Sequence, residues 1–200
     1  MTRAARTVLI ALHYQNDVIH PKGAIKLGIA ESDDVARKRL VDKAGQLLAG
    51  ARTLEVPVVH VRTARPADPR TFPVNAPIFR NVVAIGACIE GQWGSDFFDE
   101  LGPTPGETVV VHNRVNGFYD SMLETRLREL GATHLVLAGV ATNSCVEHTA
   151  RHAADMGYVV TVAHDACSAA RPEVHEAALF NIGLVGTVST VQDVIGRGFA

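Results

Sequence analysis

The sequence has little of several features that mark specialised proteins. It has three cysteines in 200 residues, 6% aromatic residues and a net charge of −2. Because Cys88, Cys145 and Cys167 are odd in number and widely spaced, they argue against a disulfide framework and favour a reducing cytoplasm. No run of Lys and Arg marks a nucleic-acid-binding face, and no apolar stretch approaches the ~18 residues of a membrane span. We therefore expect a cytoplasmic protein that binds neither nucleic acid nor membrane.

The N-terminal segment has basic residues before an apolar run, as a secretion signal does. That run, VLIAL, is interrupted by His13 and Tyr14, and no small-residue cleavage site follows it, so we expect no export. With 47% hydrophobic and 20% charged residues, the composition is that of a globular protein. The length suits one core, and we expect a single domain over 1–200.

Short β-branched runs recur along the chain. Most are continuously apolar rather than alternating, which is typical of strands covered on both faces. Six such runs are expected to form strands, at 7–12, 57–61, 108–112, 134–139, 158–163 and, more weakly, 186–190.

Segments with helical periodicity lie between these runs, at 32–54, 121–131, 143–157 and 171–183. In the first of them, Ser32 is a candidate N-cap, with Asp33 and Asp34 in the first turn. The second opens on Ser121 and Glu124 at the spacing of a capping box. This alternation of strands and helices predicts an α/β fold with a mostly parallel sheet and helices on both sides.

One interval breaks the alternation. Residues 64–106 hold six of the nine prolines and the only tryptophan, Trp93, but no clear strand. Long irregular insertions in compact domains are usually functional. We expect this one to form the wall or lid of a pocket.

Polar side chains stand where three of the predicted strands end. His13 follows the first strand, His112 ends the third, and Cys145 follows the fourth. Ligands of such sheets bind beyond the carboxyl ends of the strands, so these residues are expected at one edge. Cys145 also opens a helix, whose positive end favours thiolate and whose backbone N–H groups are available to an oxyanion. It is either a nucleophile or a buried packing residue, as we expect Cys88 and Cys167 to be.

Three stretches resemble a known family. GVATNSCVEHTARHAADMGYVVTVAHDACSA (139–169) is similar to the nucleophile segment of the isochorismatase-like cysteine hydrolases, which include nicotinamidases and N-carbamoylsarcosine amidohydrolases. TVLIALHYQNDVI resembles their first strand, and VVVHNRVNGFYDSMLETRLRELGATHLVLAG their third strand and the following helix. The resemblance covers almost the whole chain and fades over 64–106. It implies a Rossmann-like, three-layer α/β/α sandwich with a six-stranded mostly parallel sheet, and a cis peptide bond between Val140 and Ala141.

The chain departs from the family at two positions of the triad. The family uses an aspartate, a lysine and the cysteine, whereas here His13 occupies the aspartate position and His112 the lysine position. The resemblance makes His13 the favoured base and His112 its electrostatic partner, although either imidazole suits the chemistry. A histidine pair also predicts pH dependence near neutrality.

The expected reaction is hydrolysis of an amide-type C–N bond in a small substrate, because family members that retain the cysteine mostly act there. Cys145 would form a thioester, with the N–H groups of Ala141 and Cys145 as the oxyanion site. Side chains expected to line the pocket are Tyr14, Asn16, Trp93, Asn116 and Phe118. The nicotinamidase metal site has no counterpart, so we expect no metal or other cofactor and a poor fit to nicotinamide. The family also implies a homo-oligomer.

Two alternatives remain open from the sequence. Cys145, His13 and His112 are a possible Cys-His-His ligand set for zinc with an open fourth position. Alternatively, the loss of both triad partners marks an inactive relative that binds a small molecule.

Overall fold

The computed structural model describes residues 6–26, 28–29 and 34–200, so the predicted cap at Ser32 and Asp33 lies outside the described residues. Its centre is one six-stranded sheet in the order β3-β2-β1-β4-β5-β6, and every neighbouring pair is parallel. The strands are β1 (Thr7–Leu12), β2 (Val58–Thr63), β3 (Thr108–His112), β4 (His134–Gly139), β5 (Val159–Ala163) and β6 (Thr187–Ser189). The predicted α/β class and strand count are confirmed.

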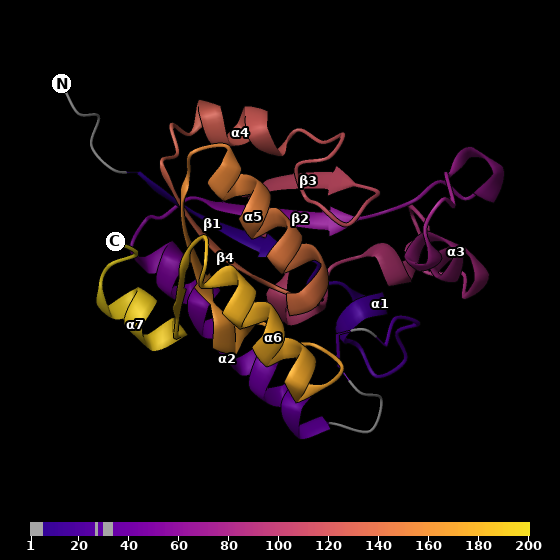
Figure 1. Ribbon diagram of the computed structural model, residues 1–200, viewed down its shortest axis with the longest axis horizontal. Coiled ribbons are helices and arrows are strands. Elements are labelled where there is room, and N and C mark those ends of the chain that lie inside the picture. The colour runs from indigo at the N-terminus through magenta and orange to yellow at the C-terminus, as the bar shows by residue number, and fades with distance from the viewer. Residues whose placement is uncertain (1–5, 27, 30–33) are drawn as a thin grey trace.

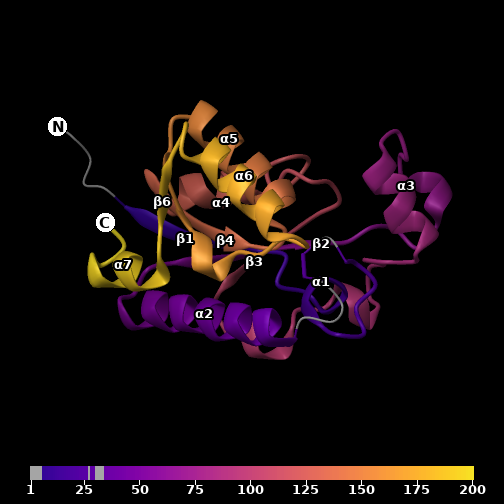
Figure 2. The ribbon, with the colours of Figure 1, turned by 60° about the horizontal axis from the view of Figure 1, so that its bottom comes forward.

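Helices cover both faces of the sheet and complete three layers (Figures 1 and 2). One face is covered by α2 (Asp34–Thr53) and α7 (Val191–Gly196). The other is covered by α4 (Leu123–Glu129), α5 (Glu147–Asp155) and α6 (Pro172–Ile182). The short α7 was not predicted from the sequence. Among the described helices, none is long and apolar enough to cross a membrane.

Strands β1 and β4 lie at the middle of the sheet and are almost wholly buried. Their backbones lie close together where β4 ends, where a Cβ atom on Gly139 would lie 2.2 Å from the Leu12 carbonyl oxygen. The chain winds outward in opposite directions from this pair, which makes it the topological switch point of the sheet. In Figure 1 the arrowheads of the strands point toward α1 (Asn16–Ile19) and α3 (Pro77–Ala84).

Residues 64–90, hereafter the arm, leave the carboxyl end of β2 and project away from the sheet (Figure 2). The arm contains a 3₁₀ turn, Pro69–Thr71, and α3, whose first residue is the proline that suits this position. None of the α3 residues is buried. The interval 64–106 holds no strand, as expected, but the sequence pattern missed α3.

The predicted capping box of α4 is wrong. The Ser121 hydroxyl donates to the Gly117 carbonyl and accepts from the backbone N–H of Leu123, while Glu124 pairs with Arg128 on the exposed face. The competing i,i+4 ion pair therefore takes the carboxylate that a capping box would use.

Candidate active site

His13 stands at the carboxyl end of β1, directly at the switch point. Its backbone N–H donates to the Val61 carbonyl of β2 at 2.8 Å, and its φ angle is +55°. A left-handed conformation is uncommon for a residue other than glycine, and such residues cluster at functional sites. The backbone turn carries the imidazole across the end of β2.

His112 ends β3 and meets His13 across the end of β2. The two Nε2 atoms are 2.6 Å apart, and the ring centroids are 4.9 Å apart. Both side chains are buried. Because a hydrogen bond between two ring nitrogens needs one donor and one acceptor, the pair shares a single proton along this contact.

Burial keeps both imidazoles neutral. It lowers the pKa of His13 well below 6.5, and the nearby His112 lowers it further. Burial lowers the pKa of His112 to about 4, although the Asn116 backbone opposes this shift. The Nδ1 atom of His112 is buried and makes no hydrogen bond of normal geometry to any described residue. These lowered pKa values place the titration of the pair below pH 6.5, whereas the histidine identities alone predict it near neutrality.

Cys145 lies in the turn formed by residues 140–146, which we call the nucleophile turn. Its helical part, Thr142–Val146, has π-helical hydrogen bonding, and the Val140–Ala141 peptide bond is cis. The sulfur lies 3.2 Å from the Val140 carbonyl oxygen and 3.7 Å from that of Ala141. Only 1% of the residue is exposed.

The surroundings of the sulfur favour the neutral thiol. Burial raises the pKa of Cys145 above its ordinary value, and Cys167 raises it further. The backbone groups of Cys145, Val146 and Ala141 bond to the sulfur and oppose the rise. Burial outweighs them, so the expectation of a thiolate at the helix tip is wrong for the resting protein.

The hydrogen bonds do not join the sulfur to the imidazoles. Cys145 bonds to carbonyls of its own turn, whereas His13 and His112 bond to each other. Across the described residues, no group of three or more His, Cys, Asp or Glu side chains is arranged to hold a metal ion. The zinc alternative therefore gains no support from this arrangement of donors.

A cavity opens at the switch point between the sheet and the arm. On the sheet side it is lined by His13 and by Val140, Ala141 and Ser144 of the nucleophile turn. Cys145, in the same turn, is buried and is not part of the lining. The arm supplies the opposite wall, with Phe72, Ile78, Phe79, Asn81 and Val82. The cavity thus sits where the fold places ligands.

Three of the predicted wall residues have other contacts and do not line this cavity. The Tyr14 hydroxyl donates to the Ala166 carbonyl at 2.5 Å. The Asn16 amide donates to the Trp93 carbonyl at 2.9 Å, and the Trp93 ring packs edge-on against His20. These contacts fasten the loops after β1 and β5.

The other two predicted wall residues, Asn116 and Phe118, also lie elsewhere. The Asn116 side-chain oxygen accepts from the Phe118 backbone N–H, which closes the turn after β3. The Phe118 ring stacks on His152 of α5, with ring centroids 5.1 Å apart. This stacking also gives His152 a packing role.

Sequence reasoning missed two arginines of the cavity, Arg65 and Arg114. The Arg114 guanidinium lies over the rings of Phe72 and Phe79, 4.8 and 4.3 Å from their centroids, and donates to the Pro73 carbonyl. Both arginines stand within two residues of a strand's carboxyl end. Since ligands bind beyond the carboxyl ends of parallel strands, this position in the sequence could have identified both arginines as candidate site residues.

Comparisons with known proteins agree with this architecture. The family model described as "Isochorismatase domain" matches residues 7–193. The ureidoacrylate amidohydrolase RutB of Caulobacter segnis is 34% identical over 204 residues, covering 95% of this chain and 84% of that protein.

Solved structures match as well. An isochorismatase family protein from Desulfovibrio vulgaris has a TM-score of 0.82 at 28% identity, covering 96% of this chain and all of that one. N-carbamoylsarcosine amidase from Thermoplasma acidophilum has a TM-score of 0.72 at 25% identity, covering 93% and 96%. Since the family model spans nearly the whole chain, the chain belongs to the isochorismatase family.

Proposed function

We propose that this protein hydrolyses an amide-type C–N bond of a small substrate through Cys145. The curated and solved relatives include proteins named for amidase chemistry, on ureidoacrylate and on N-carbamoylsarcosine. The observation that carries the proposal is the nucleophile turn. It puts a sulfur beside the backbone groups of Ala141, Cys145 and Val146, in a turn that lines the same cavity as a neutral imidazole.

His13 is the general base in this proposal. Its Nε2 is engaged with His112, and its Nδ1 has no hydrogen-bond partner among the described residues. If His13 donates along the Nε2 contact, its Nδ1 carries the free lone pair toward the cavity that the ring lines. The thiol then turns from the Val140 carbonyl toward the cavity and passes its proton to Nδ1 as the sulfur attacks the carbonyl.

The remaining steps need only these groups and water. The N–H groups of Ala141 and Cys145 hold the oxyanion of the tetrahedral intermediate. Its collapse breaks the C–N bond, and the imidazolium returns the proton to the leaving nitrogen. Water then attacks the thioester with His13 again as base, which releases the acid and restores the thiol.

His112 acts through His13. It is buried and does not line the cavity, so it cannot polarise a substrate carbonyl as a lysine at this position would. Its Nε2 accepts the His13 proton and fixes the tautomer that leaves Nδ1 of His13 as the acceptor. We therefore assign His112 a positioning role.

The test is a screen for ammonia release from ureidoacrylate, N-carbamoylsarcosine and simple primary amides. Cys145→Ala should abolish turnover, while Cys167→Ala, which removes the other buried thiol near the turn, should retain it. Turnover by Cys145→Ala would remove the nucleophile. Tight binding of these compounds without turnover by the native protein would favour the inactive relative.

A further inference from the structure

Thr142 is the first residue in the helical part of the nucleophile turn, and it is wholly buried. Its backbone N–H donates to the Ser168 carbonyl at 2.8 Å, which ties the turn to the loop after β5. Its Oγ1 lies 2.8 Å from Nδ1 of His175, in the first turn of α6. Among the described residues, this is the only hydrogen bond from a side chain of the nucleophile turn to another element.

The imidazole in this bond is neutral and acts as the acceptor. Burial lowers the pKa of His175 below 6.5. Glu176 opposes this shift, whereas His164 and Arg39 add to it. The buried hydroxyl of Thr142 needs an acceptor for its proton, and Nδ1 of His175 is the one acceptor it has among the described residues. We therefore place the donor on Thr142 and the ring proton of His175 on Nε2.

The oxyanion groups of the proposed mechanism belong to the same turn as Thr142. Ala141 directly precedes Thr142, and Cys145 follows three residues later. The backbone N–H groups of Ser144 and Val146 both donate to the Ala141 carbonyl, at 3.1 and 3.4 Å. Since the turn is closed on itself in this way, a displacement of Thr142 also displaces the two oxyanion N–H groups.

We infer that His175 is a positioning residue of the active site, which acts through Thr142 to hold the oxyanion N–H groups of Ala141 and Cys145 in place. Donors to a developing oxyanion act only when they are fixed beforehand, and a misplacement of about 1 Å costs roughly a hundredfold in rate. The effect on rate rests on the proposed function, whereas the effect on the turn does not.

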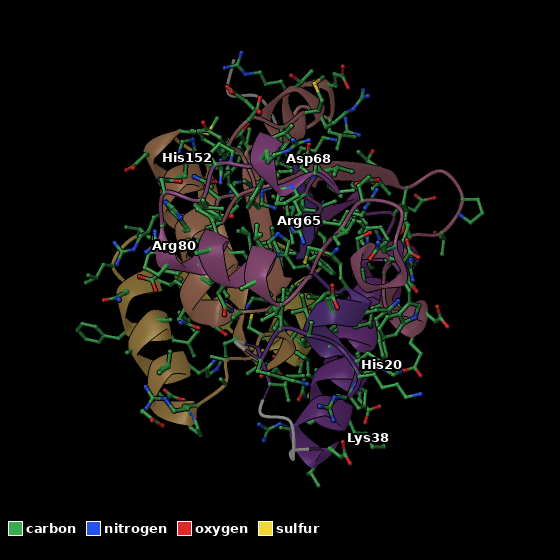
Figure 3. All side chains as sticks on the ribbon, turned by 90° about the vertical axis from the view of Figure 1, so that its right-hand side faces the viewer. His20, Lys38, Arg65, Asp68, Arg80 and His152 are labelled. Atoms are coloured by element: carbon green, nitrogen blue, oxygen red, sulfur yellow. The ribbon has the colours of Figure 1, made fainter. Side chains whose placement is uncertain are left out.

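Two residues near His175 serve as matched controls. The His164 ring lines the same second cavity of about 350 Å³ between α2 and α6, with its centroid 6.5 Å from that of His175, but it makes no hydrogen bond to the turn. Asn181 makes the other hydrogen bond of α6, to Glu147 of α5 at 3.1 Å. In Figure 3, α6 lies below the labelled His152 of α5, and α2 lies on the other side of the view.

The kinetic experiment uses the amide that the native protein turns over fastest in the screen above. His175→Phe keeps a ring but removes the acceptor, and Thr142→Val removes the donor. Each should lower kcat about tenfold or more and leave KM within about twofold, because the oxyanion groups act in the transition state. The double variant should be no slower than the slower single variant, since both remove one shared bond. His175→Asn, whose side-chain oxygen replaces Nδ1 as acceptor, should keep most of the native kcat.

Amide hydrogen exchange gives a second readout that needs no substrate. Peptides within 139–146 should exchange about tenfold faster in His175→Phe than in the native protein, because the turn opens more readily without this bond. Peptides from β1 should exchange at the native rate. His164→Gln and Asn181→Ala should leave both kcat and the exchange of the turn unchanged.

Several results would overturn the inference. They are a folded His175→Phe protein with native kcat, a loss that appears in KM alone, a His175→Asn protein as slow as His175→Phe, or an equal loss in either control. If His175→Phe does not fold, Thr142→Val decides by the same criteria. If the native protein turns over no amide, the proposed function fails by itself. Exchange then decides the role of His175, which faster exchange confined to the turn supports and unchanged exchange overturns.

Discussion

Two buried histidine sites lie toward opposite ends of β2 and β3, and they differ in how their charge is balanced. At the amino ends, His60 Nε2 lies 2.9 Å from a carboxylate oxygen of Glu107. Glu107 also accepts two bonds from the Arg52 guanidinium and one from the Thr104 backbone N–H. At the carboxyl ends, His13 and His112 pair with each other at 2.6 Å and have no carboxylate partner among the described residues.

The difference separates a structural network from the pair that the proposed mechanism uses. Around Glu107 the opposite charges neutralise each other, and neither Glu107 nor its partners line the cavity at the switch point. This network fastens α2 to the sheet. Among the described residues the His13–His112 pair has no carboxylate partner, and His13 lines a cavity that the nucleophile turn also lines. A buried group whose only partner is another base is available for proton transfer.

The largest effect should come from His13. Replacing it by Asn, which tolerates the positive φ angle, removes the proton acceptor with little backbone strain. We expect a loss of about 10³-fold in kcat/KM, in the range of general-base removal, with the unfolding midpoint nearly unchanged. A variant that keeps more than a tenth of native turnover while folded would show that another group takes the thiol proton.

A smaller loss is expected from His112. The change His112→Phe keeps an aromatic ring of similar size but removes the acceptor for His13 Nε2. We expect a decrease of about a hundredfold in kcat with KM held, because the base remains but its tautomer is no longer fixed. Separate measurement of kcat and KM distinguishes the positioning role of His112 from a role in substrate binding, because loss of a binding residue would raise KM instead.

The Glu107 network should affect stability and leave turnover alone. Burial raises the pKa of Glu107, but Arg52, the Thr104 N–H and His60 overcome this and bring it from 4.5 to about 2. A carboxylate with a depressed pKa stabilises the fold above pH 4.5, and this contribution is lost as pH falls toward 2. The shift corresponds to about 3 kcal/mol at pH 7.

Glu107→Gln should therefore lower the free energy of unfolding by roughly that amount at pH 7 and by much less at pH 3, measured in urea. Its kcat/KM at a temperature where it is folded should equal that of the native protein. A stable Glu107→Gln protein with impaired turnover would erase the distinction between the two histidine sites.

The mildest expected effect is a displaced pH profile. Because His13 and His112 have lowered pKa values, the unprotonated base persists as pH falls below 6.5. The acid limb of kcat/KM should lie well below pH 6.5, and the pair's contribution to stability should decline between pH 6.5 and about 4. An acid limb at or above pH 6.5 would mean that the imidazoles are not buried as described.

The sequence sufficed for the sheet because its strands are short, apolar and β-branched, and burial on both faces demands that pattern. The positions of His13, His112 and Cys145 followed from the rule that parallel strands end at one edge. The orientations of the side chains did not follow from that rule. The 2.6 Å contact between the imidazoles depends on the positive φ angle of His13, which lets its ring reach His112 across the intervening strand β2.

The cavity wall was the least predictable part. Tyr14, Trp93 and Phe118 looked like wall residues by composition, but each is used in packing or in a backbone contact. The wall of the cavity opposite the sheet instead includes α3, Arg65 and Arg114. The local sequence pattern of a short amphipathic helix such as α3 does not predict whether its apolar side packs on the sheet or lines a cavity.

The central claim is tested most directly by the mass of the protein during turnover. A reaction with an amide substrate, quenched in acid within milliseconds and analysed by intact-protein mass spectrometry, should show an adduct equal to the acyl group. Peptide mapping should place this adduct on Cys145, and it should accumulate in His13→Asn if deacylation is slowed more than attack. Full turnover with no adduct on the native protein, or an adduct on a different residue, would contradict a thioester at Cys145.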